Sequence, residues 1–226
     1  EIMPSLVGSE MCIRDRLTLH NFELAPFSQF TSSMGYRVDG RTNGSATMKA
    51  VLGAGEVQAD IVVDSISIND LAVPSIWLRS RWDFIQNRAG ILVQQRENLD
   101  TLVRGFYAPS QKRYYARATL DAVELSALDP LLKGVVERTG GNADVDIALR
   151  GSGKEANLSG QIAVRDFTTT VDFTQVTYTM PRTVIEVKNN HLIAEGVPLY
   201  DPEKNEGLFS IDLNLEHLSN ISYSVK

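Results

Sequence analysis

The sequence has very little cysteine and few residues that interrupt regular structure. Among 226 residues there is a single cysteine, Cys12, so no disulfide forms within the chain. Glycine (16) and proline (8) stay well below the ~25–30% of low-complexity chains, and 43% apolar residues are enough to bury a core. These values exclude intrinsic disorder of the whole chain.

Long apolar runs and an excess of positive charge are also missing. The longest apolar runs are about five residues, far short of the ~18–20 that a membrane-spanning helix needs. The net charge is −6, so the chain lacks the basic field that dominates binding to phosphate backbones. We therefore expect no nucleic acid as a partner.

Histidines are too few and too scattered to suggest a metal or catalytic site. His20, His191 and His217 lie far apart, and none has a second histidine or a cysteine at the spacing of metal ligands. The chain also lacks the Gly-x-Ser-x-Gly, His-Glu-x-x-His, P-loop and dinucleotide-binding patterns. We expect no enzyme activity, no catalytic residues, no metal and no cofactor.

The first 16 residues are interpreted as an artefact. Residues 6–16 back-translate, in one frame, to a sequence that resembles a common transposase adapter. We therefore leave residues 1–16 out of the fold and expect them to be disordered. Cys12 falls in this segment, so the remaining chain is free of cysteine, which permits an oxidising compartment. We expect the chain to be a piece of a longer protein.

Alternation of apolar and polar residues dominates the rest of the chain. In residues 209–216, Phe209, Ile211, Leu213 and Leu215 share one side of a predicted strand. The same alternation occurs in residues 60–68, 144–149, 161–167, 170–180, 182–187 and 191–197. Turn signals lie at residues 39–40, 43–44, 53–55, 140–142, 151–153, 189–190 and 201–207. The sequence predicts an all-β, mainly antiparallel fold of about a dozen strands.

Helical periodicity is limited to two short segments. Leu128, Leu131, Leu132, Val135 and Val136 fall on one helical face, which predicts a helix near residues 129–138 that ends before the glycine pair at 140–141. A weaker copy of this pattern predicts a helix near residues 26–34.

The two helical segments belong to a repeat of about a hundred residues. Residues 18–24 align with 119–125, residues 41–52 with 138–149, and residues 57–66 with 158–167, with small gaps between them. This predicts a first β repeat at 17–118 and a second at 119–226. Repeated β units bury their apolar faces against neighbours, which favours an elongated repeat sheet or solenoid. Two ordinary α+β domains are the alternative.

Several segments resemble the TamB family of translocation and assembly module proteins, within the AsmA-like group. The resemblance rests on residues 122–131, 146–153 and 158–164, and on residues 171–173, 176–178, 184–187, 196–201 and 212–218, which resemble the Bacteroidetes form of the family's C-terminal region. The loop after Asp201 is longer and more charged than is usual in the family. The linker before the second helix lacks an aromatic residue often found there.

The resemblance implies a long, taco-shaped β-sheet with an apolar groove, in the periplasm between inner and outer membranes. It implies an inner-membrane anchor outside this chain, phospholipid acyl chains as the ligand, and a BamA-type partner in outer-membrane protein assembly. The residues that we expect to face the groove are Ile61, Val63, Ile162, Val164, Phe209, Ile211, Leu213 and Leu215.

Two other functional classes stay open. A surface β-repeat adhesin predicts a closed sandwich for each hundred residues, and an accessory β-domain of a carbohydrate-active enzyme predicts paired carboxylates that face a cleft. Residues 79–82 and 112–115 mix basic and aromatic side chains, as some nucleic-acid binders do. We interpret both segments as exposed strand faces with cross-strand pairs.

Overall fold

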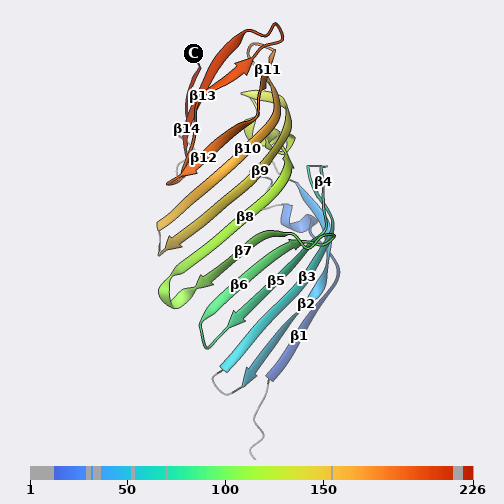
Figure 1. The fold of residues 1–226 in the computed structure, drawn as a ribbon. Coiled ribbons are helices and arrows are strands. Elements are labelled where there is room, and N and C mark those ends of the chain that lie inside the picture. The colour runs from blue at the N-terminus through green and yellow to red at the C-terminus, as the bar shows by residue number, and fades with distance from the viewer. Residues whose placement is uncertain are drawn as a thin grey trace, which may run out of the picture.

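The computed structural model describes residues 13–28, 32, 37–51, 54–69, 71–153, 155–215 and 221–225. Its strands form one 15-stranded sheet in which every pair of neighbours is antiparallel (Figure 1). The prediction of an all-β, antiparallel, elongated fold is confirmed. The strands are β1 (Ile13–Glu23), β2 (Val38–Val51), β3 (Ala54–Ile68), β4 (Leu71–Val73), β5 (Ile76–Asp83), β6 (Arg88–Gln95), β7 (Thr101–Ala108), β8 (Arg113–Glu124), β9 (Val136–Ser152), β10 (Glu155–Val171), β11 (Val176–Met180), β12 (Thr183–Lys188), β13 (His191–Tyr200), β14 (Glu206–Asn214) and β15 (Ile221–Val225).

The sheet follows chain order, and in two places a long strand pairs with two short ones. One end of β3 pairs with β4 and the rest with β5, whereas one end of β10 pairs with β11 and the rest with β12. All described strands belong to this one sheet. Within the described residues there is therefore neither a two-sheet sandwich nor a pair of separate α+β domains.

The longest strands exceed those of ordinary globular domains. Strands β9 and β10 have 17 residues each, about 56 Å at the usual rise per residue, whereas globular strands commonly have about 3–10 residues. The alternation in residues 144–149 and 161–167 lies inside these two strands. Residues 170–180, expected as one strand, contain the turn 172–175 between β10 and β11.

The helices are shorter than the sequence predicts. A 3-10 turn (η4, Leu125–Leu128) leads into α2 (Asp129–Leu132), and β9 begins at Val136, so the helix predicted near 129–138 is wrong beyond residue 132. The backbone becomes extended at Lys133, and Gly134 takes a φ of +86°, which ends the helix. Val136 instead joins the sheet, where it pairs with Val171, whereas Val135 lies in the turn before it.

The helix predicted near 26–34 is described only in part. The structure has a 3-10 turn, η1 (Ala25–Phe27), at its start. Residues 29–31 and 33–36 lie outside the described residues. A second copy of this arrangement of strand, short helix and strand is β8, η4, α2 and β9.

Three predicted turns lie inside strands instead. Residues 39–40, 43–44 and 140–142 lie inside β2 and β9. The pairing register of β2 with β3 shifts at Gly40, and Gly141 takes a φ of +100° next to a register shift between β9 and β10. Glycine signals both turns and bulges because both use a positive φ. The signals at 53–55, 151–153, 189–190 and 201–207 do separate strands.

Structural details recur at a spacing of 101 residues. The β1–β2 register shifts next to Asn21, where φ is 46°, and the β8–β9 register shifts next to Ala122, where φ is 52°. Ser65 in β3 and Asp166 in β10 share φ values of 54° and 51°. This spacing pairs residue 41 with 142, so the sequence alignment of residues 41–52 with 138–149 is displaced by four residues.

The expected disorder of residues 1–16 does not extend to the end of that segment. Residues 1–12 lie outside the described residues, but Ile13 to Arg16 belong to β1 and pair with Ala50 to Thr47 of β2. Without β1, the backbone N–H and C=O groups on this side of β2 would lack strand partners. Any residue other than proline supplies the N–H and C=O that pair with them.

Candidate apolar binding face

The register of the sheet aligns one row of apolar residues across the successive strands. Residues directly opposite each other in an antiparallel pair point to the same side of the sheet. Following the paired residues from β1 to β14 gives a row without a single polar side chain, and Leu213 at its end pairs in turn with Ile221 of β15. We call this set the central row: Leu19, Gly44, Ile61, Leu78, Val93, Val103, Ala118, Ile147, Gly160, Val187, Leu192 and Leu213.

A second row on the same side of the sheet is almost as apolar. It includes Leu17, Ala46, Ala59, Ser80, Ile91, Gly105, Ala116, Leu149 and Leu158. Its one polar side chain, Ser80, donates a hydrogen bond to the carbonyl of Gly90 at 3.0 Å. We call the side of the sheet that carries both rows the apolar face.

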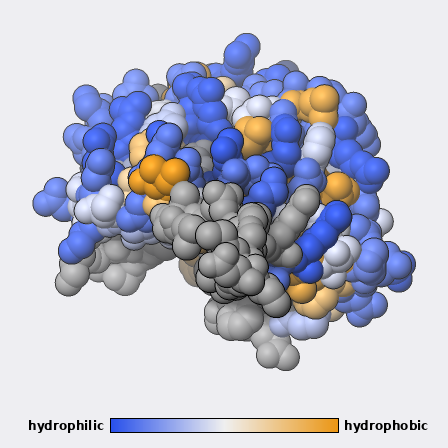
Figure 2. Space-filling view, turned by 90° about the horizontal axis from the view of Figure 1, so that it is seen from below, coloured by the Kyte–Doolittle hydropathy of each residue, from blue (hydrophilic) through white to orange (hydrophobic). Residues whose placement is uncertain are grey.

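The opposite side of the sheet is polar and carries the ion pairs. Asp60 accepts the indole N–H of Trp77 at 2.5 Å, and Arg81 pairs with Glu56 at 2.8 Å. The guanidinium of Arg117 donates two hydrogen bonds, of 2.7 and 2.6 Å, to the carboxylate of Asp146. Seen from one end of the sheet, the visible surface is mostly hydrophilic, with apolar residues in separate patches (Figure 2).

The Arg117–Asp146 pair controls the ionisation of both groups. The hydrogen bonds and the positive charge of Arg117 hold the pKa of Asp146 below its ordinary value, and Asp146 raises the pKa of Arg117. The pair lines a shallow depression on the polar side with Tyr115, Arg150 and Gln161. Because Arg117 and Asp146 bind each other, we interpret the depression as the surface around a cross-strand ion pair.

The short helix covers one end of the apolar face. Leu125 of η4 is 6% exposed and packs with Ala143 of β9 and Val164 of β10. The cluster continues through Met180, Ala194 and Val197 and includes the partly buried Ile162 and Ile211. This packing places the short helix over an open apolar margin of the sheet.

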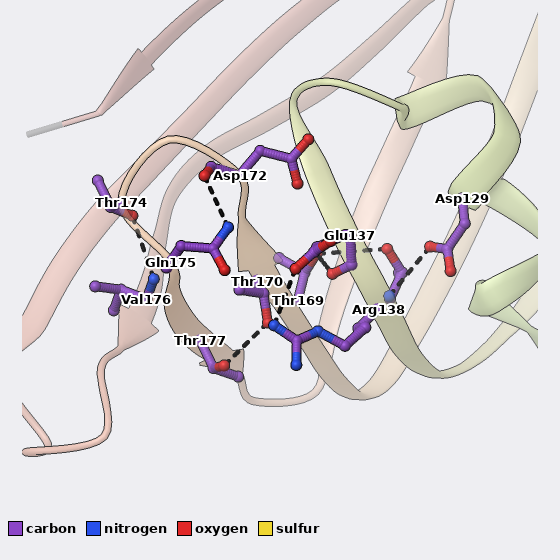
Figure 3. A network of polar contacts seen from close by, with 11 residues as sticks. Asp129, Glu137, Arg138, Thr169, Thr170, Asp172, Thr174, Gln175, Val176 and Thr177 are labelled. Atoms are coloured by element: carbon purple, nitrogen blue, oxygen red, sulfur yellow. Dashed lines mark hydrogen bonds and ion pairs between the residues drawn. The ribbon is translucent and has the colours of Figure 1, made fainter.

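A group of hydrogen-bonded polar residues lies at the same end of the sheet, next to the helix (Figure 3). The carboxylate of Asp129, at the start of α2, accepts the backbone N–H of Thr139 at 3.1 Å. Thr139, Thr169 and Thr170 are buried, and Thr170 and Thr177 hydrogen-bond through their hydroxyls at 3.0 Å. These bonds satisfy polar groups at the edge of the apolar cluster.

Away from the helix the central row is only half-buried. Ile61, Leu78, Val93 and Ile147 all have intermediate exposure, because neither a second sheet nor a long helix covers them within the described residues. The total accessible surface is 15487 Å², about one and a half times the ~10,000 Å² of a compact monomer of this mass. The apolar face is therefore a surface that a ligand can reach.

The structure places the eight residues predicted to face a groove as follows. Ile61 and Leu213 belong to the central row, and Val63, Ile162, Ile211 and Phe209 lie two or four positions away on the same face. Val164 is on this face too, but it is buried beneath Leu125. Leu215 lies beyond the end of β14, where its N–H donates to the carbonyl of Asn190 at 2.7 Å.

Sequence reasoning missed most members of the central row. Leu78, Ala118 and Ile147 lie in short alternating segments, which were the available signal, whereas Val93 and Val103 each follow another apolar residue and break the alternation. What was missing was the register that joins them, because register depends on partners far away in the chain.

The described residues contain no group of three or more histidine, cysteine, aspartate or glutamate residues able to hold a metal ion. In the same part of the chain, no helix has the length and apolar character needed to cross a membrane. Comparisons with protein-family models, curated proteins and solved structures find no match to this chain.

Proposed function

We propose that this chain is part of a non-enzymatic cell-envelope protein of the TamB type, which shields phospholipid acyl chains along its apolar face. The observation that carries this proposal is the central row, which crosses the sheet from β1 to β14 without a polar side chain. A surface of this kind gives an acyl chain a continuous apolar path perpendicular to the strands.

The shape of the sheet supports a groove. An open sheet of 15 strands exceeds the roughly ten strands at which twisted sheets curl or split. Glycines lie on the apolar face where neighbouring backbones approach closely, since a Cβ at Gly44 would lie 2.3 Å from the carbonyl oxygen of Asp60, and one at Gly160 would lie 2.1 Å from that of Asp146. Small residues on this face leave space on the inner side of a curled sheet.

Burial of an acyl chain against the apolar face releases enough free energy to hold the chain there. Each methylene removed from water contributes about 0.8 kcal/mol, so an acyl chain of ordinary length gains on the order of 10 kcal/mol when it is fully covered. A half-covered chain gains several kcal/mol, which permits both capture and release. A continuous row also lets a chain slide along it without crossing a polar barrier.

The proposed wider role rests on the resemblance to the TamB family. We place the protein in the periplasm of a diderm bacterium, anchored in the inner membrane by a segment outside this chain. Phospholipid transport between the membranes, support of outer-membrane protein assembly with a BamA-type partner, or both, would use the apolar face.

Site-specific photo-crosslinking tests the proposal. Val93 and Leu92 are adjacent in β6, but Val93 belongs to the central row and Leu92 pairs with Arg79 and Arg104 on the polar side. A benzophenone amino acid at position 93 should capture phospholipid when the protein is irradiated in cells of a diderm bacterium. The same group at position 92 is the matched control and should capture none.

The outcomes separate the functional classes. Capture at 93 and not at 92 supports the groove. Equal capture at both positions, or capture at neither position while lipid is captured elsewhere in the same protein, overturns it. A carbohydrate crosslinked at either position would favour an accessory binding domain instead.

A further inference from the structure

Aromatic and basic residues lie together at one end of the strands, where successive hairpin turns form a long margin of the sheet. Alternate turns of an antiparallel sheet lie on the same edge, so the β2–β3, β5–β6, β7–β8 and β9–β10 turns follow one another along the lower left of Figure 1. Backbone hydrogen bonds join them, since the N–H of Phe84 donates to Gly55 at 3.0 Å and that of Gly153 donates to Lys112 at 2.8 Å. We call this margin the hairpin edge.

The β5–β6 turn presents two apolar side chains at this edge. Phe84 is 44% exposed and Ile85 is 76% exposed. The turn is fixed, because the carboxylate of Asp83 accepts the N–H groups of Ile85 and Gln86, both at 2.9 Å. The exposure of Phe84 and Ile85 is therefore held by the turn.

Aromatic residues line the apolar face directly behind this turn. Trp82, Tyr107 and Tyr114 occupy one register row, through Ala89 between the first two. The ring of Trp82 lies 6.3 Å from that of Phe84. The hydroxyl of Tyr114 donates to the carbonyl of Glu155 at 2.9 Å, across the neighbouring turns.

Cations flank the apolar tip. Arg88 in the β5–β6 hairpin, and Lys112 and Arg113 in the next turn along the edge, are exposed. The acidic groups here are Asp83, which is engaged in its turn, Glu56, which pairs with Arg81 at 2.8 Å, and the exposed Glu155. Turns at the other edge carry five acidic residues and two cations: Glu97, Asp100, Asp172, Asp201 and Glu203, against Arg96 and Lys204. In a chain with a net charge of −6, the hairpin edge is thus a local exception.

We propose that the hairpin edge docks on the surface of an anionic lipid bilayer. Phe84 and Ile85 insert at the level of the headgroups, Trp82, Tyr107 and Tyr114 lie at the interface, and Arg88, Lys112 and Arg113 contact acidic headgroups. Aromatic residues favour the membrane interface, and each basic residue near an anionic surface adds attraction. Binding to a membrane surface strengthens with the apolar area buried in it and with attraction to anionic lipids, and the hairpin edge offers both.

Vesicle flotation tests this surface with the full chain. Vesicles of phosphatidylglycerol and phosphatidylcholine in equal amounts should bind the protein, and vesicles of phosphatidylcholine alone should bind it weakly. The double substitution Phe84→Ser and Ile85→Ser should lower binding to the anionic vesicles at least about tenfold, because two apolar side chains no longer insert. The double substitution Lys112→Glu and Arg113→Glu should have an effect of similar size, about tenfold, that disappears at high salt.

Phe173→Ser is the matched control. Phe173 is 96% exposed at the tip of the β10–β11 turn, on the other edge and next to Asp172. This variant should bind anionic vesicles as the unchanged protein does. Equal binding to both vesicle types, or a loss with Phe173→Ser as large as that with the Phe84 and Ile85 double variant, overturns the proposal.

Docking at the hairpin edge does not require the proposed acyl-chain path. Capture of a fluorescent fatty acid in solution without vesicles reports the apolar face alone, and circular dichroism checks the fold of each variant. The Phe84 and Ile85 double variant should lose vesicle binding and keep fatty-acid capture. Vesicle binding by the unchanged protein without any capture of the fatty acid would contradict the acyl-chain path while leaving the docking surface intact.

Discussion

The backbone N–H of Ala122 donates to the carboxylate of Asp144 at 3.0 Å, across the β8–β9 bulge. The N–H of Asn21 donates to the side-chain oxygen of Asn43 at 2.8 Å, at the same place 101 residues earlier. The two bulges are therefore closed by the same bond from different residue types. The side chain at this position serves as an acceptor for a backbone N–H, since an amide oxygen in one copy takes the place of a carboxylate in the other.

This equivalence predicts how position 144 tolerates substitution. Asp144→Ala removes the acceptor for Ala122 and should lower the free energy of unfolding by about 1–2 kcal/mol. Asp144→Asn keeps an acceptor, as in the first copy, and should cost less than about 1 kcal/mol, which is the loss of the partly exposed ion pair with Arg165. Urea denaturation of both variants measures the difference. Equal destabilisation by Asn and Ala would contradict the equivalence.

Close approach of neighbouring strands predicts the behaviour of two glycines. A Cβ at Gly44 would lie 2.3 Å from the carbonyl oxygen of Asp60, whereas one at Gly90 would lie 3.9 Å from that of Arg81. Gly44→Ala should therefore cost about 1–3 kcal/mol of stability. Gly90→Ala should be neutral or stabilising by up to about 1 kcal/mol, because it restricts the unfolded chain. Denaturation midpoints compare them, and a tolerated Gly44→Ala would mean that the strands lie farther apart.

The side chain of Asn190 bonds the backbone of β10 in place of a strand partner where β12 ends. It is buried, with its side-chain amide donating to the carbonyl of Ala156 at 2.7 Å and its side-chain oxygen accepting the N–H of Leu158. Asn190→Ala should cost about 2–4 kcal/mol, because both backbone groups of β10 lose their partner. The adjacent Asn189 is exposed, and its side-chain oxygen accepts a hydrogen bond of 3.2 Å from the side chain of Asn157. Asn189→Ala is the control and should cost no more than about 1 kcal/mol. A thermal melt in which the two variants coincide would contradict this role.

The Arg117–Asp146 pair predicts a pH dependence. Arg117 lowers the pKa of Asp146, so the carboxylate stabilises the fold above the ordinary pKa of an aspartate, and this contribution is lost as the pH falls through the lowered pKa. The difference in stability between the unchanged protein and Arg117→Ala should thus be largest near neutral pH and shrink in acid. NMR titration should find the pKa of Asp146 closer to its ordinary value in the variant. An unchanged titration would show that the pair does not form in solution.

A charge in the central row should impair lipid capture. Ile147 lies in this row, whereas the adjacent Ala148 pairs with Arg117 on the polar side. Ile147→Glu and Leu213→Glu should reduce capture of phospholipid by about tenfold or more, because a carboxylate must be desolvated beside the acyl chain. Ala148→Glu should leave capture unchanged. The readout is radiolabelled phospholipid retained by the purified protein, with secondary structure compared by circular dichroism.

The sequence by itself determined the strands and their apolar sides. Alternation in residues 161–167 and 209–214 reflects the period of a strand, and side chains at positions i and i+2 point to one face whatever the strand pairs with. It also placed the turns at 151–153 and 189–190, since their residues favour the backbone angles of a turn. These are local properties of a few consecutive residues.

Only the tertiary structure decided the register, and with it the apolar path. Glycine at 140–141 favours a positive φ in a bulge as much as in a turn, and pairing of β9 with β10 selects the bulge. Val135 and Val136 fit a helix or a strand, and the partner Val171 draws Val136 into the sheet. The alignment of Leu78 with Val93 and of Ala118 with Ile147 likewise depends on hydrogen bonds between strands. A short sequence pattern cannot contain these choices, because each one depends on a partner strand elsewhere in the chain.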